Sequence, residues 1–168
     1  MSARGLTAGL LSLSLFATSH ACTAAVATVG WIENVKLGEE GVVVAAKLDT
    51  GALTSSLHAT EVRWTSKADG DWVTFDVIGA DGVRARFERK VVRISRVKRA
   101  SGGSQSRPVV LMDVCLGHVR LLTEVNLTDR SGFNYEFLIG RRYLSRQFAV
   151  DSSRTHTIDP ACAESGKQ

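Results

Sequence analysis

Apolar and polar residues alternate with a period of two in part of this chain, which is the pattern of half-buried β-strands. The clearest example is residues 83–90, where Val83, Ala85 and Phe87 alternate with charged side chains. A similar pattern continues over residues 91–97. Short strands that recur between turn signals predict an all-β domain, closed or partly open as a β-barrel.

The remaining strands are predicted from short apolar runs that are bounded by turn residues. They cover residues 27–31, 35–37, 42–48, 53–57, 72–78, 109–116, 119–127, 135–139 and 148–151. Residues 61–65 extend the strand over residues 53–57. Ala80-Asp81-Gly82 is a strong hairpin turn signal between two of these runs. Residues 141–147 predict one short helix near the C-terminal end.

Composition supports one globular domain, because 44% of the 168 residues are hydrophobic and 23% are charged. The net charge of +4 mildly favours acidic partners or substrates. This charge is too small and too spread out to indicate a nucleic-acid-binding protein. The sequence also lacks a P-loop motif, so it gives no support for ATP binding.

The N-terminal residues 1–25 have the features of a signal peptide. Arg4 precedes an apolar stretch over residues 5–17, and small residues suited to cleavage follow it. The stretch is too short to span a membrane, although an uncleaved N-terminal anchor is the alternative interpretation. Cys22 could carry a lipid anchor, but Ser19 stands where a lipoprotein signal usually has Leu, so this is not favoured.

These features predict a periplasmic protein without a stable membrane span. A signal peptide over residues 1–25 is expected to precede one domain over residues 26–158, and residues 159–168 are expected to form a flexible tail. An oxidising compartment allows disulfides to form.

The three cysteines are Cys22 at the cleavage region, Cys115 in an apolar run and Cys162 in the polar tail. A disulfide between Cys115 and Cys162 is one option, but the sequence leaves the pairing open. The cysteines and the four histidines form no CxxC, HExxH or other close cluster. We therefore expect no metal site.

The strongest chemical signal is Asp49-Thr50-Gly51, which directly follows the apolar run over residues 42–48. A β-branched run that stops at Asp-Thr-Gly predicts a buried strand ending in a tight turn that holds a carboxylate. Gly51 allows a close backbone approach that a Cβ would block. Because all three residues are common turn formers, the tripeptide alone is usually only a turn.

A second stretch, Phe137-Leu138-Ile139-Gly140-Arg141, strengthens the case for chemistry. The two stretches together resemble the retropepsin family of aspartic peptidases, in which an apolar-apolar-Gly strand packs against the catalytic loop. The blocks that sharpen this resemblance are Asp49-Thr50-Gly51-Ala52, Arg107-Pro108-Val109-Val110, Leu127-Thr128-Asp129-Arg130-Ser131, Leu138-Ile139-Gly140-Arg141 and Val150-Asp151. In this order they resemble the RimB-like bacterial retropepsins over roughly residues 29–158, a branch often labelled as ATP-dependent zinc proteases.

The resemblance implies an aspartic endopeptidase that uses two carboxylates sharing one proton, with no metal ion or cofactor. This chain has one Asp-Thr-Gly, so a homodimer is expected to supply the second carboxylate. The expected site residues are Asp49, Thr50 and Gly51 for catalysis, Ala52, Arg107 and Arg130 for binding the peptide substrate, and Ile139, Gly140 and Arg141 for support of the catalytic loop. The substrates that the resemblance implies are acidic or glutamate-rich peptides.

Several assignments stay open on the sequence alone. Arg107 and Arg130 could grip substrate carboxylates, but they are equally consistent with scaffold residues bonded to backbone carbonyls. Leu53 stands where retroviral members have an acid that pairs with the residue after the late Gly, which puts that ion pair of Arg141 in doubt. Residues 98–105 are either a solvated hairpin loop or a flap over the substrate. The alternative to a peptidase is a non-catalytic peptide-binding or assembly module that retains the fold.

Overall fold

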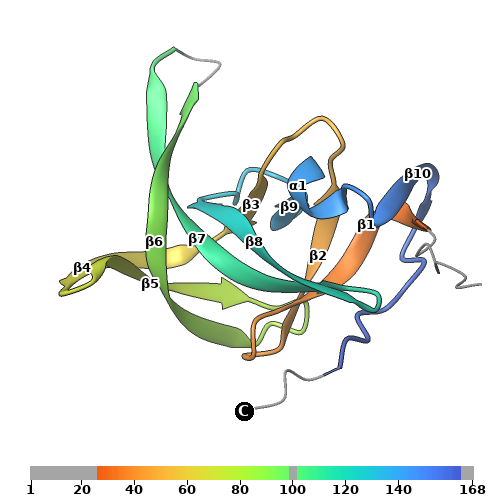
Figure 1. Ribbon diagram of the computed structural model, residues 1–168, viewed down its shortest axis with the longest axis horizontal. Coiled ribbons are helices and arrows are strands. Elements are labelled where there is room, and N and C mark those ends of the chain that lie inside the picture. Colours follow the sequence, from red (N-terminus) through yellow and green to blue (C-terminus); the bar gives the residue numbers. More distant parts are fainter. Residues whose placement is uncertain (1–25, 99–101, 164–168) are drawn as a thin grey trace, which may run out of the picture.

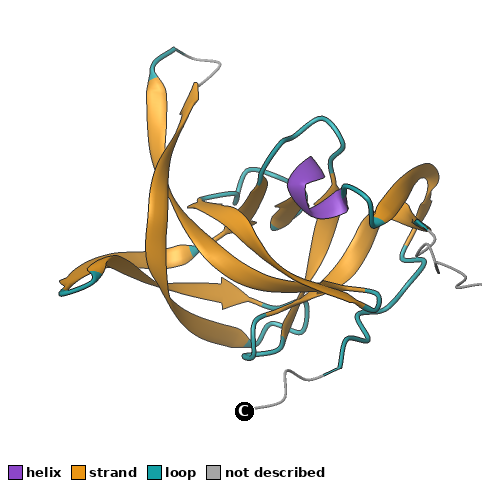
Figure 2. Ribbon diagram, in the orientation of Figure 1, coloured by secondary structure: helices purple, strands orange, loops and turns teal. Residues whose placement is uncertain are grey.

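The computed structural model describes residues 26–98 and 102–163, which form an almost entirely β fold with one short helix, as the sequence predicted (Figure 2). The predicted signal peptide with Cys22 lies outside the described residues, as do residues 99–101 of the segment predicted as a hairpin loop or a flap and residues 164–168 of the predicted tail. No helix among the described residues is long and apolar enough to cross a membrane.

Strands follow one another along nearly the whole described chain, and the helix interrupts them once. The elements are β1 (Ala27–Leu37), β2 (Val42–Leu48), β3 (Ser55–His58), β4 (Thr60–Lys67), β5 (Gly70–Ile78), β6 (Arg84–Lys98), β7 (Ser104–Leu116), β8 (Val119–Thr128), β9 (Phe137–Ile139), α1 (Arg141–Leu144) and β10 (Phe148–Thr155).

The strands hydrogen-bond in the order β10-β1-β2-β9-β3-β8-β7-β6-β5-β4. An additional pairing of β1 with β7, which sets Leu37 opposite Val114, closes β1, β2, β9, β3, β8 and β7 into a ring. Figure 1 shows β6 and β7 rising above this ring as a long hairpin, while β4 and β5 extend to one side. The Asp49–Gly51 turn after β2 therefore adjoins the closed ring of strands.

The hydrophobic core lies against one face of each strand, and β2 shows how alternation produces this arrangement. Val42, Val44, Ala46 and Leu48 are buried, whereas the odd-numbered side chains between them are half-buried on the opposite face. The opposite face of β2 is thus available to a functional site.

Most strands are longer than predicted: β7 begins at Ser104 rather than at residue 109, and β10 continues to Thr155 rather than to residue 151. Two strands each join a pair of predicted strands. Residues 27–31 and 35–37 belong to the single strand β1, and residues 83–90 and 91–97 form most of the single strand β6. The sequence pattern breaks at polar residues such as Glu33, but the backbone of Glu33 still pairs with that of Ala46 on β2. Backbone pairing continues through a polar residue because every residue carries the same donor and acceptor.

Three elements are shorter than predicted. The strand expected over residues 135–139 is limited to Phe137–Ile139, and the extension expected over residues 61–65 belongs to the separate strand β4. The strand expected over residues 53–57 begins only at Ser55, because the Leu53 carbonyl instead accepts a hydrogen bond from the Arg142 N–H at the start of α1. The helix expected over residues 141–147 ends at Leu144, since Ser145 has a non-helical ψ of 128°.

The C-terminal segment is bonded across the end of the ring. Cys115 on β7 and Cys162 form a disulfide with a Cα–Cα distance of 6.1 Å, which is the pairing that the sequence left open. The Ala161 N–H donates to the Gly117 carbonyl at 2.7 Å. The described part of the tail that was predicted to be flexible is therefore attached to the turn between β7 and β8.

Candidate active site

The turn after β2 holds the Asp49 carboxylate by backbone donors of its own loop. Asp49 Oδ1 accepts hydrogen bonds from the Gly51 N–H at 2.9 Å and from the Ala52 N–H at 3.2 Å. A Cβ at residue 51 would lie 3.1 Å from the same Oδ1, so glycine gives the turn its close approach. The Asp49 N–H in turn donates to the Ile139 carbonyl on β9 at 2.8 Å.

The start of α1 fastens the other side of this turn. The Arg141 N–H donates to the Ala52 carbonyl at 2.8 Å, and Arg141 Nη1 donates to the carbonyls of Thr50 and Gly51 at 3.0 and 3.1 Å. Arg141 therefore contacts the catalytic-type loop through backbone carbonyls rather than through an acidic side chain. These contacts explain how the loop is held although Leu53 replaces the acid of retroviral members.

Gly140 lets β9 and the turn approach closely. A Cβ on Gly140 would lie 2.7 Å from the carbonyl carbon of Thr54, so a larger residue would push the two segments apart. The Gly140 N–H donates to Ser55 Oγ at 3.2 Å. Ile139, Gly140 and Arg141 thus all touch the segment that carries Asp49.

A buried polar network lies behind this contact. Asn126 Nδ2 donates to the Ser55 carbonyl at 2.6 Å, and Asn126 Oδ1 accepts from Ser56 Oγ at 3.0 Å. Arg107 Nη1 also donates to Asn126 Oδ1, at 3.3 Å, and its Nε and Nη2 donate to Gln105 Oε1. Arg107 therefore lies on β7 at the base of the β6–β7 hairpin, and its role in substrate binding stays a prediction.

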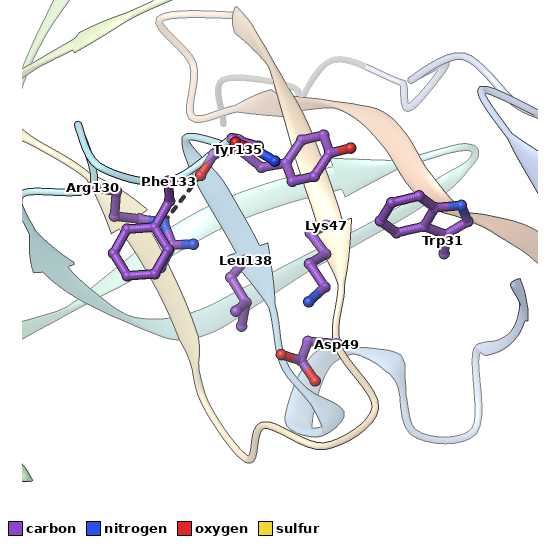
Figure 3. Close-up of a pocket in the computed structure, with 8 residues that line it drawn as sticks. Trp31, Lys47, Asp49, Arg130, Phe133, Tyr135 and Leu138 are labelled. Atoms are coloured by element: carbon purple, nitrogen blue, oxygen red, sulfur yellow. Dashed lines mark hydrogen bonds between the residues drawn. The ribbon is translucent and has the colours of Figure 1, made fainter. Parts of the chain in front are cut away.

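Asp49 faces a cleft of about 440 Å³, which we call the Asp49 cleft. Its lining residues come from β1, β2, β9 and the loop before β9, and they are Trp31, Lys47, Asp49, Arg130, Phe133, Asn134, Tyr135 and Leu138 (Figure 3). Of the predicted substrate-binding residues, the lining includes Arg130 and does not include Ala52 or Arg107. Ala52 instead takes part in the turn through its backbone.

Comparison with known proteins agrees with this geometry. A family model described as the retropepsin-like aspartic endopeptidase RimB matches residues 28–161.

The chain belongs to this RimB-like family.

One solved relative is a Legionella pneumophila protein of unknown function, whose crystal structure gives a TM-score of 0.66 at 35% identity and covers 78% of this chain and 97% of that one. A Shewanella pealeana protein named "Probable alpha-L-glutamate ligase" is 33% identical over 118 residues, which is 68% of this chain and 26% of that protein. A protein of the same name from Shewanella halifaxensis is 31% identical over the same shares. The RimB-like chain thus spans about a quarter of the length of the curated relatives it matches, and both the family and these names indicate an enzyme.

Arg130 combines a scaffold contact with a place in the Asp49 cleft. Its side chain is 8% exposed, its Nε donates to the Tyr135 carbonyl at 3.1 Å, and its guanidinium lies 4.6 Å from the centre of the Phe133 ring. Burial and the nearby charge of Arg107 lower the pKa of Arg130, while the negative charge of Asp49 acts in the opposite direction. The sequence left both roles open, and the structure combines the backbone contact with a position beside Asp49.

Lys47 and the aromatic residues that line the Asp49 cleft were not among the predicted site residues. Lys47 could have been found, because a residue two positions before Asp49 on a strand shares its face. Trp31 and Tyr135 meet edge to face with 5.9 Å between ring centroids, and no local pattern links two residues so far apart in the chain. Among residues 26–98 and 102–163, no group of three His, Cys, Asp or Glu side chains is arranged to hold a metal ion.

Proposed function

We propose that this chain is an aspartic endopeptidase that hydrolyses peptide bonds with Asp49 from each of two identical chains. The observation that carries the proposal is the asymmetry of the Asp49 carboxylate in the cleft. Oδ1 is held by the N–H groups of Gly51 and Ala52, whereas Oδ2 accepts no hydrogen bond from the described residues. Oδ2 is therefore available to an attacking water or to a peptide carbonyl.

The chemistry requires two carboxylates that share one proton. One removes a proton from the attacking water, and the other polarises the scissile carbonyl. Asp49 is the one acidic residue that lines the described cleft, and the sequence contains no second Asp-Thr-Gly. A second copy across a two-fold axis supplies the missing carboxylate and completes the site.

The face beside the turn suits contact with that second copy. The Thr50 side chain is exposed next to Asp49, so its hydroxyl can reach the partner's loop. A shallow depression of about 170 Å³ adjoins it and is lined by Thr50, Arg141, Leu144, Ser145 and Phe148. We place the dimer contact over this face.

Acidic or glutamate-rich peptides are the proposed substrates. Two cations, Lys47 and Arg130, line the cleft beside a single acid. The match to proteins named as α-L-glutamate ligases supports the same substrate class. The Cys115–Cys162 disulfide supports the proposed periplasmic location, since such bonds persist in oxidising compartments.

The test is cleavage of a glutamate-rich peptide library by the mature protein and by two matched variants. Asp49→Asn removes the proposed catalytic acid. Asp81→Asn is the control, because Asp81 Oδ1 also accepts a bond from the N–H two residues ahead, at 2.9 Å from Val83. We expect the control to cut at the wild-type rate and Asp49→Asn to be inactive; equal cutting by all three proteins would refute the assignment.

A second candidate function is a non-catalytic peptide-binding module. It is favoured by one observation: the chain matches only about a quarter of relatives that are named for ligation rather than hydrolysis. On this alternative the wild-type protein binds the peptides and releases them uncut at every pH. Mass spectrometry of the peptides after incubation separates the two functions.

A further inference from the structure

Lys47 occupies the position on β2 that is nearest to Asp49 on the same face. The buried side chains of β2 are even-numbered, and Lys47 and Asp49 both point to the opposite side. Figure 3 shows the Lys47 side chain extending along β2 toward Asp49, with Leu138 and Trp31 on either side. Residues two positions apart on a strand, such as Lys47 and Asp49, are separated by about 6.6 Å along it.

The Lys47 ammonium group has no partner in the described part of the chain. It makes no ion pair or hydrogen bond there, although it lines the same cleft as the Asp49 carboxylate. Lys47 pairs through its backbone with Leu138 on β9, which fixes the base of its side chain. Lys47 as a whole residue is half-buried, and an ammonium group whose three donors are unused within the described residues is suited to bind an anion.

Arg130 is less available for this purpose than Lys47. Its Nε is bonded to the Tyr135 carbonyl, and its guanidinium stacks on the Phe133 ring, so its position is set by the loop before β9. Lys47 has neither restriction. Its flexible side chain can bring the ammonium group to a substrate carboxylate that lies close to Asp49.

We infer that Lys47 binds the carboxylate of an acidic side chain on the substrate residue next to the scissile bond, and so determines which bond is cut. The inference rests on the proposed peptidase function. An extended peptide presents alternate side chains to each face. When its scissile carbonyl lies over Asp49, the side chain of an adjoining residue extends along β2 toward Lys47. A glutamate side chain is long enough to meet the ammonium group.

The test compares two peptides that differ only by Glu or Gln at the residue flanking the cleaved bond. The measured quantity is the ratio of their kcat/KM values in the wild-type protein, in Lys47→Met, in Lys47→Arg and in Lys36→Met. Lys36 is the matched control, since it is also half-buried, lies on the neighbouring strand β1 and does not line the Asp49 cleft. Fluorescence binding of both peptides to each protein provides a second readout.

We expect the wild-type protein and Lys36→Met to prefer the Glu peptide by roughly tenfold or more, the range for a hydrogen bond between charged groups. Lys47→Met should bring the ratio close to one, and Lys47→Arg should restore much of it. An unchanged ratio in Lys47→Met, with both peptides cut, overturns the inference and leaves the peptidase function intact. If no peptide is cut but Lys47 still sets a binding preference for Glu, the proposed peptidase function fails and only the role of Lys47 in binding the glutamate carboxylate stands. If the wild-type protein binds the Glu and Gln peptides equally and cuts neither, both the peptidase function and the role of Lys47 are overturned.

Discussion

Glu33 and Asp49 are carboxylates on neighbouring strands, and they are bound in opposite ways. Glu33 on β1 is 0% exposed and accepts hydrogen bonds through both oxygens from Gly30, Thr157 and Ile158. Asp49 is half-buried, and within residues 26–98 and 102–163 it accepts side-chain hydrogen bonds through Oδ1 alone, from its own turn. One carboxylate joins distant segments of the chain, and the other keeps an oxygen free for the cleft.

The hydrogen-bond partners of a carboxylate decide whether it is committed to the fold. Burial raises the pKa of Glu33, but hydrogen bonds from Thr157, Gly30 and Ile158 outweigh it and lower the pKa below its usual range. Glu33 is therefore ionised and fully engaged, which leaves it no capacity for proton transfer. Asp49 has backbone partners on one oxygen, and the proposed catalytic role uses the other.

We expect the largest effect from the substitution of Asp49, the proposed catalytic residue. Asp49→Asn should lower kcat/KM by roughly a thousandfold or more, as expected for a group that transfers protons directly. The free energy of unfolding should change by less than about 1 kcal/mol, because Asn retains an oxygen that can accept the same backbone bonds. Peptide cleavage and urea unfolding measure the two quantities. Strong destabilisation by this substitution would mean that Asp49 is structural like Glu33.

The next effect concerns the segment that covers Glu33. Cys162→Ser removes the disulfide to Cys115, which joins residues 47 positions apart, and should lower the free energy of unfolding by about 2–4 kcal/mol. Urea unfolding of the variant, compared with reduced and oxidised wild-type protein, measures this loss. If the variant matches the oxidised wild type, the disulfide does not hold the C-terminal segment.

Glu33→Gln should lower the free energy of unfolding by about 2 kcal/mol, since Gln cannot satisfy all of the buried donors. A carboxylate with a lowered folded pKa stabilises the fold above its ordinary pKa of 4.5, and this contribution is lost as the pH falls through the folded pKa. Wild-type stability should therefore fall with pH below this value more steeply than that of the variant. Glu39→Gln, at an exposed position in the β1–β2 turn, is the control and should behave as wild type.

Arg141→Lys should give the smallest effect, with about 1 kcal/mol lost from the free energy of unfolding. Lysine cannot reproduce the guanidinium donor that reaches the carbonyls of Thr50 and Gly51 together. The loss in kcat/KM, expressed as a free energy, should exceed the loss in the free energy of unfolding, because these hydrogen bonds position the turn that carries Asp49. Arg146→Lys, at an exposed site after α1, provides the comparison, and equal activity of the two variants would argue against a positioning role for Arg141.

The sequence predicted much of the fold because the alternation over residues 83–90 and apolar runs such as residues 42–48 are local properties of the chain. It also predicted that Asp49 and Gly140 lie close together, although this came from the family resemblance rather than from the residues alone. It did not predict the Glu33–Thr157 contact or the Trp31–Tyr135 pair. Such contacts join residues far apart in the chain, and only the closed ring brings them together.

The most direct test of the two-carboxylate site is to mix wild-type protein with Asp49→Asn and allow the subunits to exchange. A mixed dimer carries a single Asp49, so only wild-type pairs can cut peptide. At constant total protein above the dimer dissociation constant, activity should follow the square of the wild-type fraction. Activity that instead falls in simple proportion to the wild-type fraction would show that one chain is sufficient, and the shared site would be wrong.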